Sequence, residues 1–351
     1  MDALRPISIG ILGAGQLAEH VLFGTLRRLP AVRVAAIADP SEARRAVATR
    51  WFPGARIDAD AAEMLAGVRL DAVVVSCPPA AHAEEAMRAL DAGVHLYVEK
   101  PLATDLPAAR ALAERARTSG RVAMAGLNYR HHPLVRRLRD ALGAGRIGAP
   151  LAMHTVFSTA RAAEGWRASP ESGGGVLFEL GSHHFDLARF LFAAEIGAVT
   201  ARVWSRRSGG DSAVVDLELT TGVRACMTLA MGAADEDHVF VLGEAGTAAF
   251  DRMQGDLVFR PREFRYGRRH SFARGTATAV SALAGAARRP GEPSYERALS
   301  AFLAAIRTGR PARPDFDDGV RSLEAVEAAL RSSRSGTRVE LGACATGALA
   351  P

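Results

Sequence analysis

The sequence has almost no lysine. Lysine and arginine together number 44 among 351 residues, and Lys100 is the only lysine; Asn128 is likewise the only asparagine. Arginine keeps its charge at any working pH and presents a planar fork, whereas lysine is a compact ammonium whose pKa responds to its surroundings. A lysine kept in such a chain indicates a position where a guanidinium cannot substitute, which favours a chemical role. The alternative is a surface lysine that escaped a compositional bias.

Cysteine and long apolar runs are also scarce. Cys77, Cys226 and Cys344 are an odd set without CxxC spacing, which excludes a zinc site and a disulfide framework and suits a reducing compartment. No uncharged run approaches the eighteen or more apolar residues of a membrane span. No charged leader with a cleavage site precedes the first apolar run. We therefore expect a cytoplasmic protein with no membrane partner.

The formal net charge of +6 comes without a basic arm. The arginines are spread along the chain, interleaved with acids, and show no aromatic stacking pattern. We therefore expect no nucleic-acid partner. The length predicts two domains.

A glycine-rich motif follows the first apolar run. A strand over Ile7–Leu12 leads into Gly13-Ala14-Gly15-Gln16-Leu17-Ala18, and a helical pattern follows. Gly13 permits a tight turn, Gly15 lets the backbone approach a pyrophosphate, and Ala18 lets the helix pack close to the strand. The helix N-terminus offers free N–H groups to the phosphates. The motif predicts a dinucleotide site, and a plain strand-to-helix turn is the alternative.

An acid ends the second strand. The apolar run Val32–Ala38 stops at Asp39, where a carboxylate holds the adenine ribose hydroxyls of NAD. A carboxylate there would repel the 2'-phosphate of NADP, so we expect NAD to be preferred. Arg44 and Arg45 follow closely, and they keep NADP open as the alternative.

Strands and helices alternate through the rest of the first domain. Three further strands are predicted over residues 72–75, 94–98 and 122–127, with helices over 80–92 and 106–119. Alternation of this kind predicts a doubly wound parallel sheet of the Rossmann type, and ligands bind at the carboxyl ends of its strands. We expect this domain to span residues 1–127.

The pattern changes in the second domain, which we expect over residues 128–351. Period-two runs predict strands over 151–158, 199–206, 214–219 and 223–231, and helices close the chain over 295–308 and 317–333. The domain is thus an α+β layer with an open, mostly antiparallel sheet. Its open face predicts a homodimer or homotetramer. Residues 262–294 have no clear period and predict a loop.

The densest group of candidate catalytic side chains follows Gly173-Gly174-Gly175. At helical spacing Glu179, His183 and Asp186 share a face, whereas His184 turns aside. A histidine beside two carboxylates can hold a proton near neutral pH. A metal site would need three or more convergent ligands, and we expect none. A purely structural helix is the other alternative.

In order along the chain, these motifs resemble the Gfo/Idh/MocA family of sugar and inositol oxidoreductases. The resemblance is carried by the glycine motif, Glu99-Lys100-Pro101 after one strand, Asn128-Tyr129-Arg130 after the next, and Gly181-x-His183-x-x-Asp186. It extends over nearly the whole chain. It implies a Rossmann domain followed by a domain built on an open sheet, with the active site between the two.

The resemblance also implies residue roles. Lys100 would hydrogen-bond the reacting hydroxyl, and His183 would take or return its proton. The family commonly has aspartate four residues before that histidine, whereas Glu179 adds a methylene here. Asp186 would contact substrate hydroxyls or orient His183, and the Lys100–Pro101 bond is expected to be cis.

Three sets of site residues follow. The predicted catalytic residues are Lys100, Glu179 and His183. The predicted cofactor-binding residues are Gly13, Gly15, Gln16, Leu17, Ala18, Asp39, Pro78, Pro79, His82, Glu99, Lys100, Pro101 and Asn128. The predicted substrate-binding residues form a polar set suited to a sugar or polyol: Lys100, Tyr129, Arg130, His131, His154, Arg161, Trp166, Arg167, His183 and Asp186.

The sequence therefore predicts hydride transfer between NAD(H) and a secondary alcohol or ketone of a sugar, inositol or nucleotide sugar. Two alternatives remain open: an NAD-dependent glycosidase that uses transient oxidation, and a non-catalytic relative that senses the cofactor. Presence of both Lys100 and His183 argues against the second, because a regulator is free to lose them.

Overall fold

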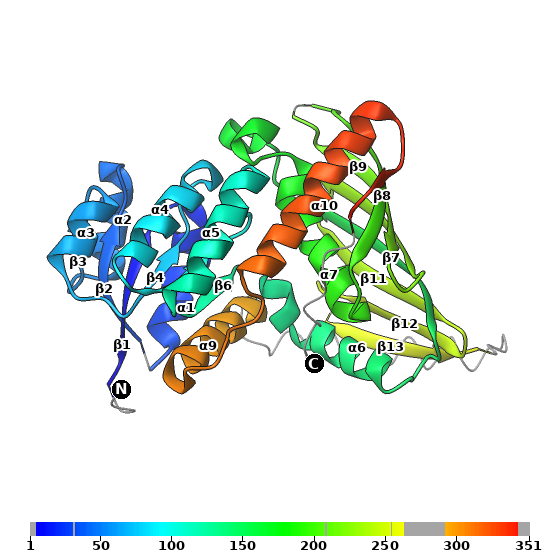
Figure 1. Cartoon of the computed structure of the whole chain (residues 1–351), viewed down its shortest axis with the longest axis horizontal. Coiled ribbons are helices and arrows are strands. Elements are labelled where there is room, and N and C mark those ends of the chain that lie inside the picture. Colours follow the sequence, from blue (N-terminus) through cyan, green and yellow to red (C-terminus); the bar gives the residue numbers. More distant parts are fainter. Residues whose placement is uncertain (1–4, 31, 208, 254, 263–291, 343–351) are drawn as a thin grey trace. The chain divides into compact units, whose positions relative to one another are not determined.

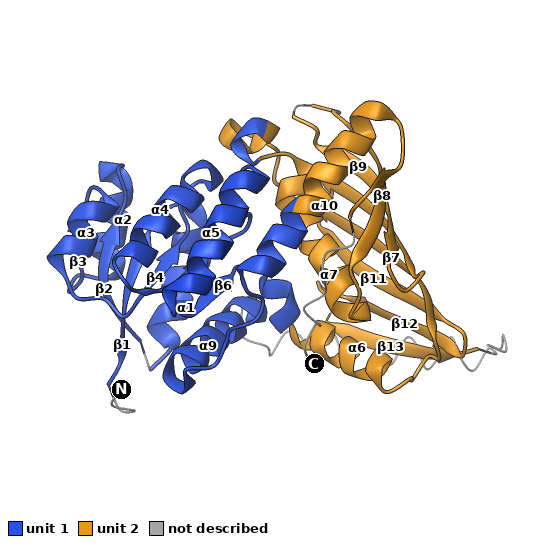
Figure 2. Cartoon of the chain, in the orientation of Figure 1, with its two compact units in different colours: residues 1–131, 171–173, 292–323 blue, residues 132–170, 174–291, 324–351 orange. Residues whose placement is uncertain are grey.

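The computed structural model describes residues 5–30, 32–207, 209–253, 255–262 and 292–342 (Figure 1). Of the loop expected over 262–294, residues 263–291 lie outside the described residues, as does Cys344. The chain forms two compact units (Figure 2). The first unit comprises Met1–His131, Glu171–Gly173 and Glu292–Leu323, and the second comprises His132–Pro170, Gly174–Gly291 and Glu324–Pro351.

The first unit is built on a six-stranded sheet whose described pairs are all parallel. The order is β3-β2-β1-β4-β5-β6, which is the doubly wound Rossmann order and confirms the predicted fold class. The strands are β1 (Ile7–Leu12), β2 (Val32–Ala38), β3 (Arg56–Asp58), β4 (Ala72–Val75), β5 (His95–Val98) and β6 (Ala123–Ala125). Only β3 was not predicted, because three residues are too few to show a period.

Helices connect these strands. They are η1 (Ala18–Leu22), which is a π-helical turn continuing into α1 (Phe23–Arg28), then α2 (Glu42–Trp51), α3 (Ala61–Gly67), α4 (Pro79–Asp91) and α5 (Leu106–Ser119). Their ends follow local rules. Asp105 caps α5 by accepting a hydrogen bond from the N–H of Ala108 at 2.9 Å, and Gly120 ends it with a φ of 65°. The same rules made this helix predictable to the residue.

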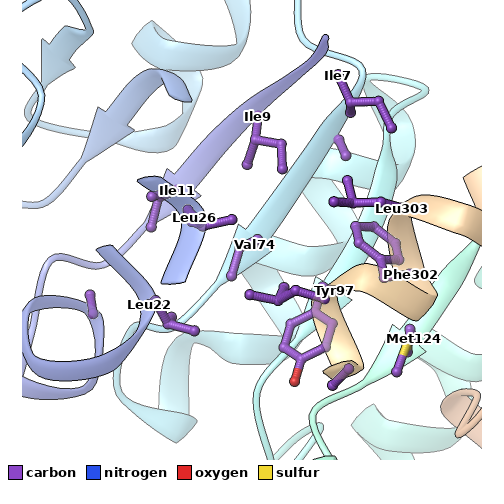
Figure 3. Packing of buried hydrophobic residues seen from close by; sticks show 14 of the residues in the cluster. Ile7, Ile9, Ile11, Leu22, Leu26, Val74, Tyr97, Met124, Phe302 and Leu303 are labelled. Atoms are coloured by element: carbon purple, nitrogen blue, oxygen red, sulfur yellow. The ribbon is translucent and has the colours of Figure 1, made fainter. Parts of the chain in front are cut away.

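A late segment of the chain completes the core of the first unit. Helix α9 (Pro293–Thr308) buries Phe302 against Tyr97, with ring centroids 5.9 Å apart, beside Ile7 and Leu303 (Figure 3). Burial of one such side chain contributes about 1.5–3 kcal/mol. The compact units therefore differ from the expected domains, because residues 292–323 pack with the Rossmann sheet and not with the second unit.

The second unit is built on an eight-stranded sheet in the order β13-β12-β11-β7-β10-β9-β8-β14. Neighbours pair antiparallel except β10 with β7, so the sheet is mixed but mostly antiparallel, as predicted. The strands are β7 (Pro150–Thr159), β8 (Ile196–Trp204), β9 (Ser212–Leu219), β10 (Arg224–Met231), β11 (Glu236–Gly243), β12 (Gly246–Asp251), β13 (Asp256–Pro261) and β14 (Val339–Glu340). The last three hairpin strands and β14 were not predicted.

The helices of the second unit carry the histidine segment. They are α6 (Pro133–Gly143), the short turns η3 (Gly165–Ala168) and η5 (Leu177–Gly181), and α7 (Ser182–Phe192). Helix α10 (Phe316–Ser335) begins in the first unit and ends in the second. Gly336, directly after α10, has a φ of 69°, and Gly309 after α9 has a φ of 66°. Both glycines adopt the left-handed conformation expected after a helix.

A search of the described helices for a stretch with the length and hydropathy of a bilayer crossing finds none.

Candidate functional site

The glycine turn after β1 fits a dinucleotide. Gly13 has a φ of 93°, and a Cβ there would lie 2.5 Å from the backbone nitrogen of Cys77, so only glycine is accommodated. A Cβ on Gly15 would meet no atom within 4 Å. The space beside the backbone of Gly15 is therefore open, as the close approach of a pyrophosphate requires.

The helix after this turn begins with free donors. In the part of the chain that the structure describes, no protein group accepts a hydrogen bond from the backbone N–H groups of Gly15, Gln16 or Leu17. Such N–H groups at a helix start bind anionic oxygens. The turn and the helix start thus fit the phosphates of a bound dinucleotide, and Ala18 is fully buried, as close packing on the strand demands.

Asp39 lies beside this turn at the end of β2. Its Oδ2 accepts a hydrogen bond from the N–H of Ala14 at 2.8 Å, and its Oδ1 accepts one from the N–H of Ser41 at 2.9 Å. A carboxylate has about four acceptor positions, so capacity remains for ribose hydroxyls. The side chain is thereby fixed against the glycine turn, where the sequence predicted a ribose ligand.

The two nearby arginines are both engaged. Arg44 Nη1 lies 3.1 Å from Glu19 Oε2, and Arg45 Nη1 donates to the carbonyl oxygens of Asp39 and Pro40 at 2.9 Å each. Both guanidinium groups thus have protein partners in this structure.

The loop after β5 carries the single lysine. The Lys100–Pro101 peptide bond is cis, as expected. Glu99 is buried, and its N–H donates to the carbonyl of Val75 in β4 at 3.0 Å. Burial raises the pKa of the Glu99 carboxyl to about 8, against the charge of Lys100, which lowers it. Glu99 therefore carries a proton at neutral pH, while the Lys100 side chain is only half-buried.

His82 lies behind that loop. It belongs to the first turn of α4 and is 1% exposed. Its Nδ1 lies 2.6 Å from the carbonyl oxygen of Pro101, and its Nε2 lies 2.8 Å from the carbonyl oxygen of Cys77. Both ring nitrogens thus face protein carbonyls, and the predicted contact of His82 with the cofactor stays a prediction.

The residues after β6 are mostly used within the first unit. Asn128 Nδ2 donates to Ser294 Oγ at 2.7 Å, which ties this turn to α9. Arg130 forms a buried ion pair with Asp318. His131 Nε2 lies 3.1 Å from the carbonyl oxygen of Arg313.

Arg130 and His131 thus bond to groups within the first unit, and the substrate roles predicted for them stay predictions. Tyr129 is also buried. The partners of this turn lie more than 160 residues away in sequence, which is why no local spacing signalled them.

Glu179 lies in the second unit with two predicted substrate residues. Its Oε2 is 3.3 Å from Nε of Arg167, and that guanidinium lies 4.4 Å from the ring centroid of Trp166. All three side chains are partly exposed. An arginine held by a carboxylate and an aromatic face keeps its terminal N–H groups oriented. The structure thus brings these three predicted residues together.

His183 and Asp186 lie on the buried helix α7. His183 is 7% exposed, whereas Asp186 is 1% exposed and its Oδ1 lies 3.2 Å from Arg189 Nη1. Arg189 also binds Glu195 at 2.7 Å and 2.8 Å. Asp186 is thus buried and paired with Arg189, and its predicted contact with substrate hydroxyls stays a prediction. The spacing of three residues between Asp186 and Arg189 was a signal for the pair.

His184 turns aside from His183, as predicted. Its ring stacks on Phe157 with centroids 4.7 Å apart, and its Nε2 lies 3.7 Å from Asp237. Burial lowers the pKa of His184 to about 4, so the ring is neutral. His184 is a packing residue of the sheet.

Two predicted substrate residues lie elsewhere. His154 is exposed, and it lies on the face of the sheet opposite Phe157 and α7, where its ring centroid is 6.4 Å from that of Phe240. The structure therefore separates His154 from His183. Arg161 is exposed in the loop after β7. Among the described side chains, no three of His, Cys, Asp or Glu gather to hold a metal ion.

Comparison with known proteins identifies the family. The oxidoreductase family with an NAD-binding Rossmann fold matches residues 7–127, and the GFO/IDH/MocA C-terminal domain matches residues 135–249. A 1,5-anhydro-D-fructose reductase of Ensifer adhaerens is 30% identical over 342 residues, covering 95% of this chain and 98% of the relative. The chain belongs to the Gfo/Idh/MocA family. It is thus an oxidoreductase with an NAD-binding Rossmann domain, as the sequence predicted.

Solved structures of similar proteins agree with this fold. GenD2 from gentamicin A biosynthesis, in complex with NAD, superposes with a TM-score of 0.82 at 26% identity and covers 98% of both chains. KijD10, a 3-ketoreductase from Actinomadura kijaniata in complex with TDP-benzene and NADP, superposes with a TM-score of 0.76 at 25% identity, over 93% of this chain and 98% of that one. The family thus includes proteins seen with either dinucleotide.

Proposed function

We propose that this oxidoreductase transfers a hydride between NAD(H) and a secondary alcohol or ketone of a sugar, inositol or nucleotide sugar. The observation that carries the proposal lies in the first unit. The only lysine of the chain follows β5 at the carboxyl edge of the sheet that also carries the glycine turn and Asp39. A dinucleotide bound at that edge meets the residues that follow β4 and β5.

Lys100 and His183 are the proposed catalytic groups. NAD, when bound, supplies the hydride acceptor. The Lys100 ammonium donates a hydrogen bond to the reacting oxygen and stabilises the negative charge that grows there. His183 takes the hydroxyl proton and returns it in the reverse direction. The proposal requires that both side chains reach the same hydroxyl, which a crystal structure with bound NAD and substrate tests directly.

We infer a preference for NAD over NADP from Asp39 and its neighbours. The Asp39 carboxylate is fixed by two backbone N–H groups and would repel a 2'-phosphate, while Arg44 and Arg45 are engaged elsewhere. Gln16, Leu17, Pro78, Pro79, Glu99 and Pro101 complete the proposed cofactor-binding set.

The substrate is proposed to be carbohydrate-like. Support comes from the activity named for the Ensifer adhaerens reductase and from the nucleotide analogue bound by the 3-ketoreductase. Arg167, oriented by Glu179 and Trp166, is suited to a phosphate or carboxylate of such a substrate. We assign substrate contact to this group and to Arg161, and we leave His154 out.

The experiment that tests the function is incubation with NAD and a panel of sugars, inositols and nucleotide sugars while NADH absorbance is followed. Sustained NADH formation with one compound supports the proposal. Cleavage of a glycosidic bond without net NADH would replace it with the glycosidase. Tight NAD binding with no reaction across the panel, in either direction, would favour a cofactor sensor.

Self-association through the open sheet is also proposed. The face opposite α7 exposes five large apolar side chains, each 40–48% exposed: Val156, Trp204, Val214, Leu242 and Val258. A monomeric protein rarely exposes so many large apolar side chains on one face. We propose a cytoplasmic homodimer or homotetramer that buries this face. Analytical ultracentrifugation of wild type and a Val156→Lys variant tests it, and a wild-type monomer at micromolar concentration would refute it.

A further inference from the structure

The two ring nitrogens of His82 face backbone carbonyl oxygens. Nδ1 lies 2.6 Å from the carbonyl oxygen of Pro101, and Nε2 lies 2.8 Å from the carbonyl oxygen of Cys77. Both distances are within hydrogen-bonding range, and because a carbonyl oxygen only accepts, each bond needs a proton on the ring nitrogen. One buried side chain therefore spans two loops that leave the sheet at its ligand-binding edge.

The chemistry of imidazole assigns the donor. A neutral ring has one N–H and the charged ring has two. Burial lowers the pKa of His82, and the charge of Lys100 acts in the same direction, whereas the carbonyl groups of Pro101, Cys77 and Glu99 raise it. In the neutral ring the shorter distance marks Nδ1 as the donor to Pro101. A charged ring would keep that bond and add the one to Cys77.

The two bonded carbonyls flank predicted cofactor residues. Cys77 immediately precedes Pro78, and Pro101 immediately follows Lys100. The strands that lead to them, β4 and β5, are neighbours in the sheet. Their backbone pairing ends at Val75 and Val98. Beyond that point the N–H of Glu99 donates to the carbonyl oxygen of Val75 and links the two loops through the backbone. His82 adds a link on the far side of Lys100.

We propose that His82 is a positioning residue, whose Nδ1–H bond to Pro101 fastens the Lys100 loop to the start of α4 and so fixes the place of the Lys100 ammonium. The catalytic consequence rests on the proposed function of Lys100. His82 itself is 1% exposed, so its role is to position Lys100 and not to contact substrate. Displacement of a catalytic group by about 1 Å can cost about 100-fold in rate, so the link is expected to act on kcat more than on cofactor binding.

Three substitutions at position 82 separate the two bonds. Asn carries an amide N–H near the position of Nδ1, Gln carries one near the position of Nε2, and Phe fills the volume with no donor. We expect His82→Asn to keep kcat within a few-fold of wild type. His82→Gln and His82→Phe are expected to lose about 10- to 100-fold. The KM for NAD should change little in all three, because the glycine turn and Asp39 are unaltered.

His95 provides the matched control. It is a partly buried histidine at the first residue of β5, at the opposite edge of the same sheet, where its Nδ1 accepts from the N–H of Val122 at 2.9 Å. His95→Phe is expected to lower thermal stability without changing kcat. A His82→Gln variant as active as His82→Asn, or a folded His82→Phe with wild-type kcat, would overturn the proposal.

The single lysine permits a readout that needs no turnover. Lysine labelled with ¹³C at Cε gives one side-chain resonance, that of Lys100. We expect this resonance to shift in His82→Gln and His82→Phe and to stay in place in His82→Asn and His95→Phe. Unchanged resonances throughout would refute the positioning role. If the resonance shifts as expected but the protein oxidises no compound of the panel, the positioning role of His82 is supported and the proposed function is refuted.

Discussion

Arg130 and Asp318 form a bidentate ion pair in the core of the first unit. Nη1 lies 3.1 Å from Oδ2 and Nη2 lies 2.9 Å from Oδ1, and the two side chains are 5% and 2% exposed. The pair joins the turn after β6 to the start of α10 across 188 residues of sequence. Asp318 Oδ2 also accepts from the N–H of Asp315 at 3.2 Å. Arg130 therefore stabilises the fold.

Removal of the Asp318 charge should destabilise the protein strongly. Asp318→Asn leaves the Arg130 guanidinium buried without a full partner, and breaking a buried pair in this way costs about 3–5 kcal/mol. Urea unfolding measures the change. The control is Glu114→Gln, which removes an exposed pair with Arg117 and should cost under about 0.5 kcal/mol. An Asp318→Asn protein of wild-type stability but raised substrate KM would return Arg130 to the substrate site.

Lys100→Arg should abolish most turnover while the protein stays folded. The charge survives, but the planar fork of arginine cannot place one N–H on one oxygen as an ammonium does. We expect kcat to fall at least about 100-fold and NADH binding, followed by fluorescence, to remain within a few-fold. Arg310→Lys, the reverse exchange at an exposed position, should be silent. Near wild-type kcat in Lys100→Arg would remove Lys100 from the mechanism.

His183→Ala should cost about 100-fold or more in kcat, the usual contribution of a positioned acid or base. The matched control is the neighbouring His184→Phe, which removes a buried neutral ring stacked on Phe157. That variant should lose stability and keep kcat. Equal losses of kcat in the two variants, with equal stability, would contradict the separate roles of the histidines.

Asp39→Asn should weaken NADH binding and reduce the preference for NADH over NADPH. The amide keeps only one acceptor oxygen for the N–H groups of Ala14 and Ser41 and no longer repels a 2'-phosphate. Adding Glu19→Gln should favour NADPH further, because it releases Arg44 from its pair. Titration of both reduced cofactors checks this. Tighter binding of NADPH than NADH by the wild-type protein would overturn the NAD preference.

Local patterns predicted most of the fold, and distance in sequence explains what they missed. The strand, glycine turn and helix from Ile7 onward are fixed by apolar period and by Gly13, whose conformation no other residue adopts easily. Packing of α9 on Tyr97 and the pairing of Arg130 with Asp318 depend on contacts between remote segments. No spacing rule reports such contacts, so the sequence did not predict them.

The same limit applies within the site. The glycine turn and Asp39 were predicted from a motif, whereas His154 was predicted from polarity alone. Its strand alternates, so one step along β7 decides which face a side chain takes. The structure puts His154 opposite Phe157, away from α7.

Stability should depend on the ionisation of Glu99. Burial raises the pKa of this carboxyl in the folded protein to about 8, against an ordinary value of 4.5. At a pH between these two values, the Glu99 carboxyl keeps its proton in the folded protein but has released it in the unfolded chain. The free energy of unfolding therefore falls as pH rises through this window, by roughly 1.4 kcal/mol per pH unit, and levels off above it.

Glu99→Gln removes this dependence, because the amide carries no ionisable proton. The difference in unfolding free energy between Glu99→Gln and wild type should therefore grow in favour of the variant from pH 5 to pH 8 and stay constant above. Urea unfolding of both proteins at five pH values measures it. A constant difference over that range would show that Glu99 is ionised in the folded state. The Lys100 ammonium would then stabilise the ionised Glu99 carboxylate against the cost of burial.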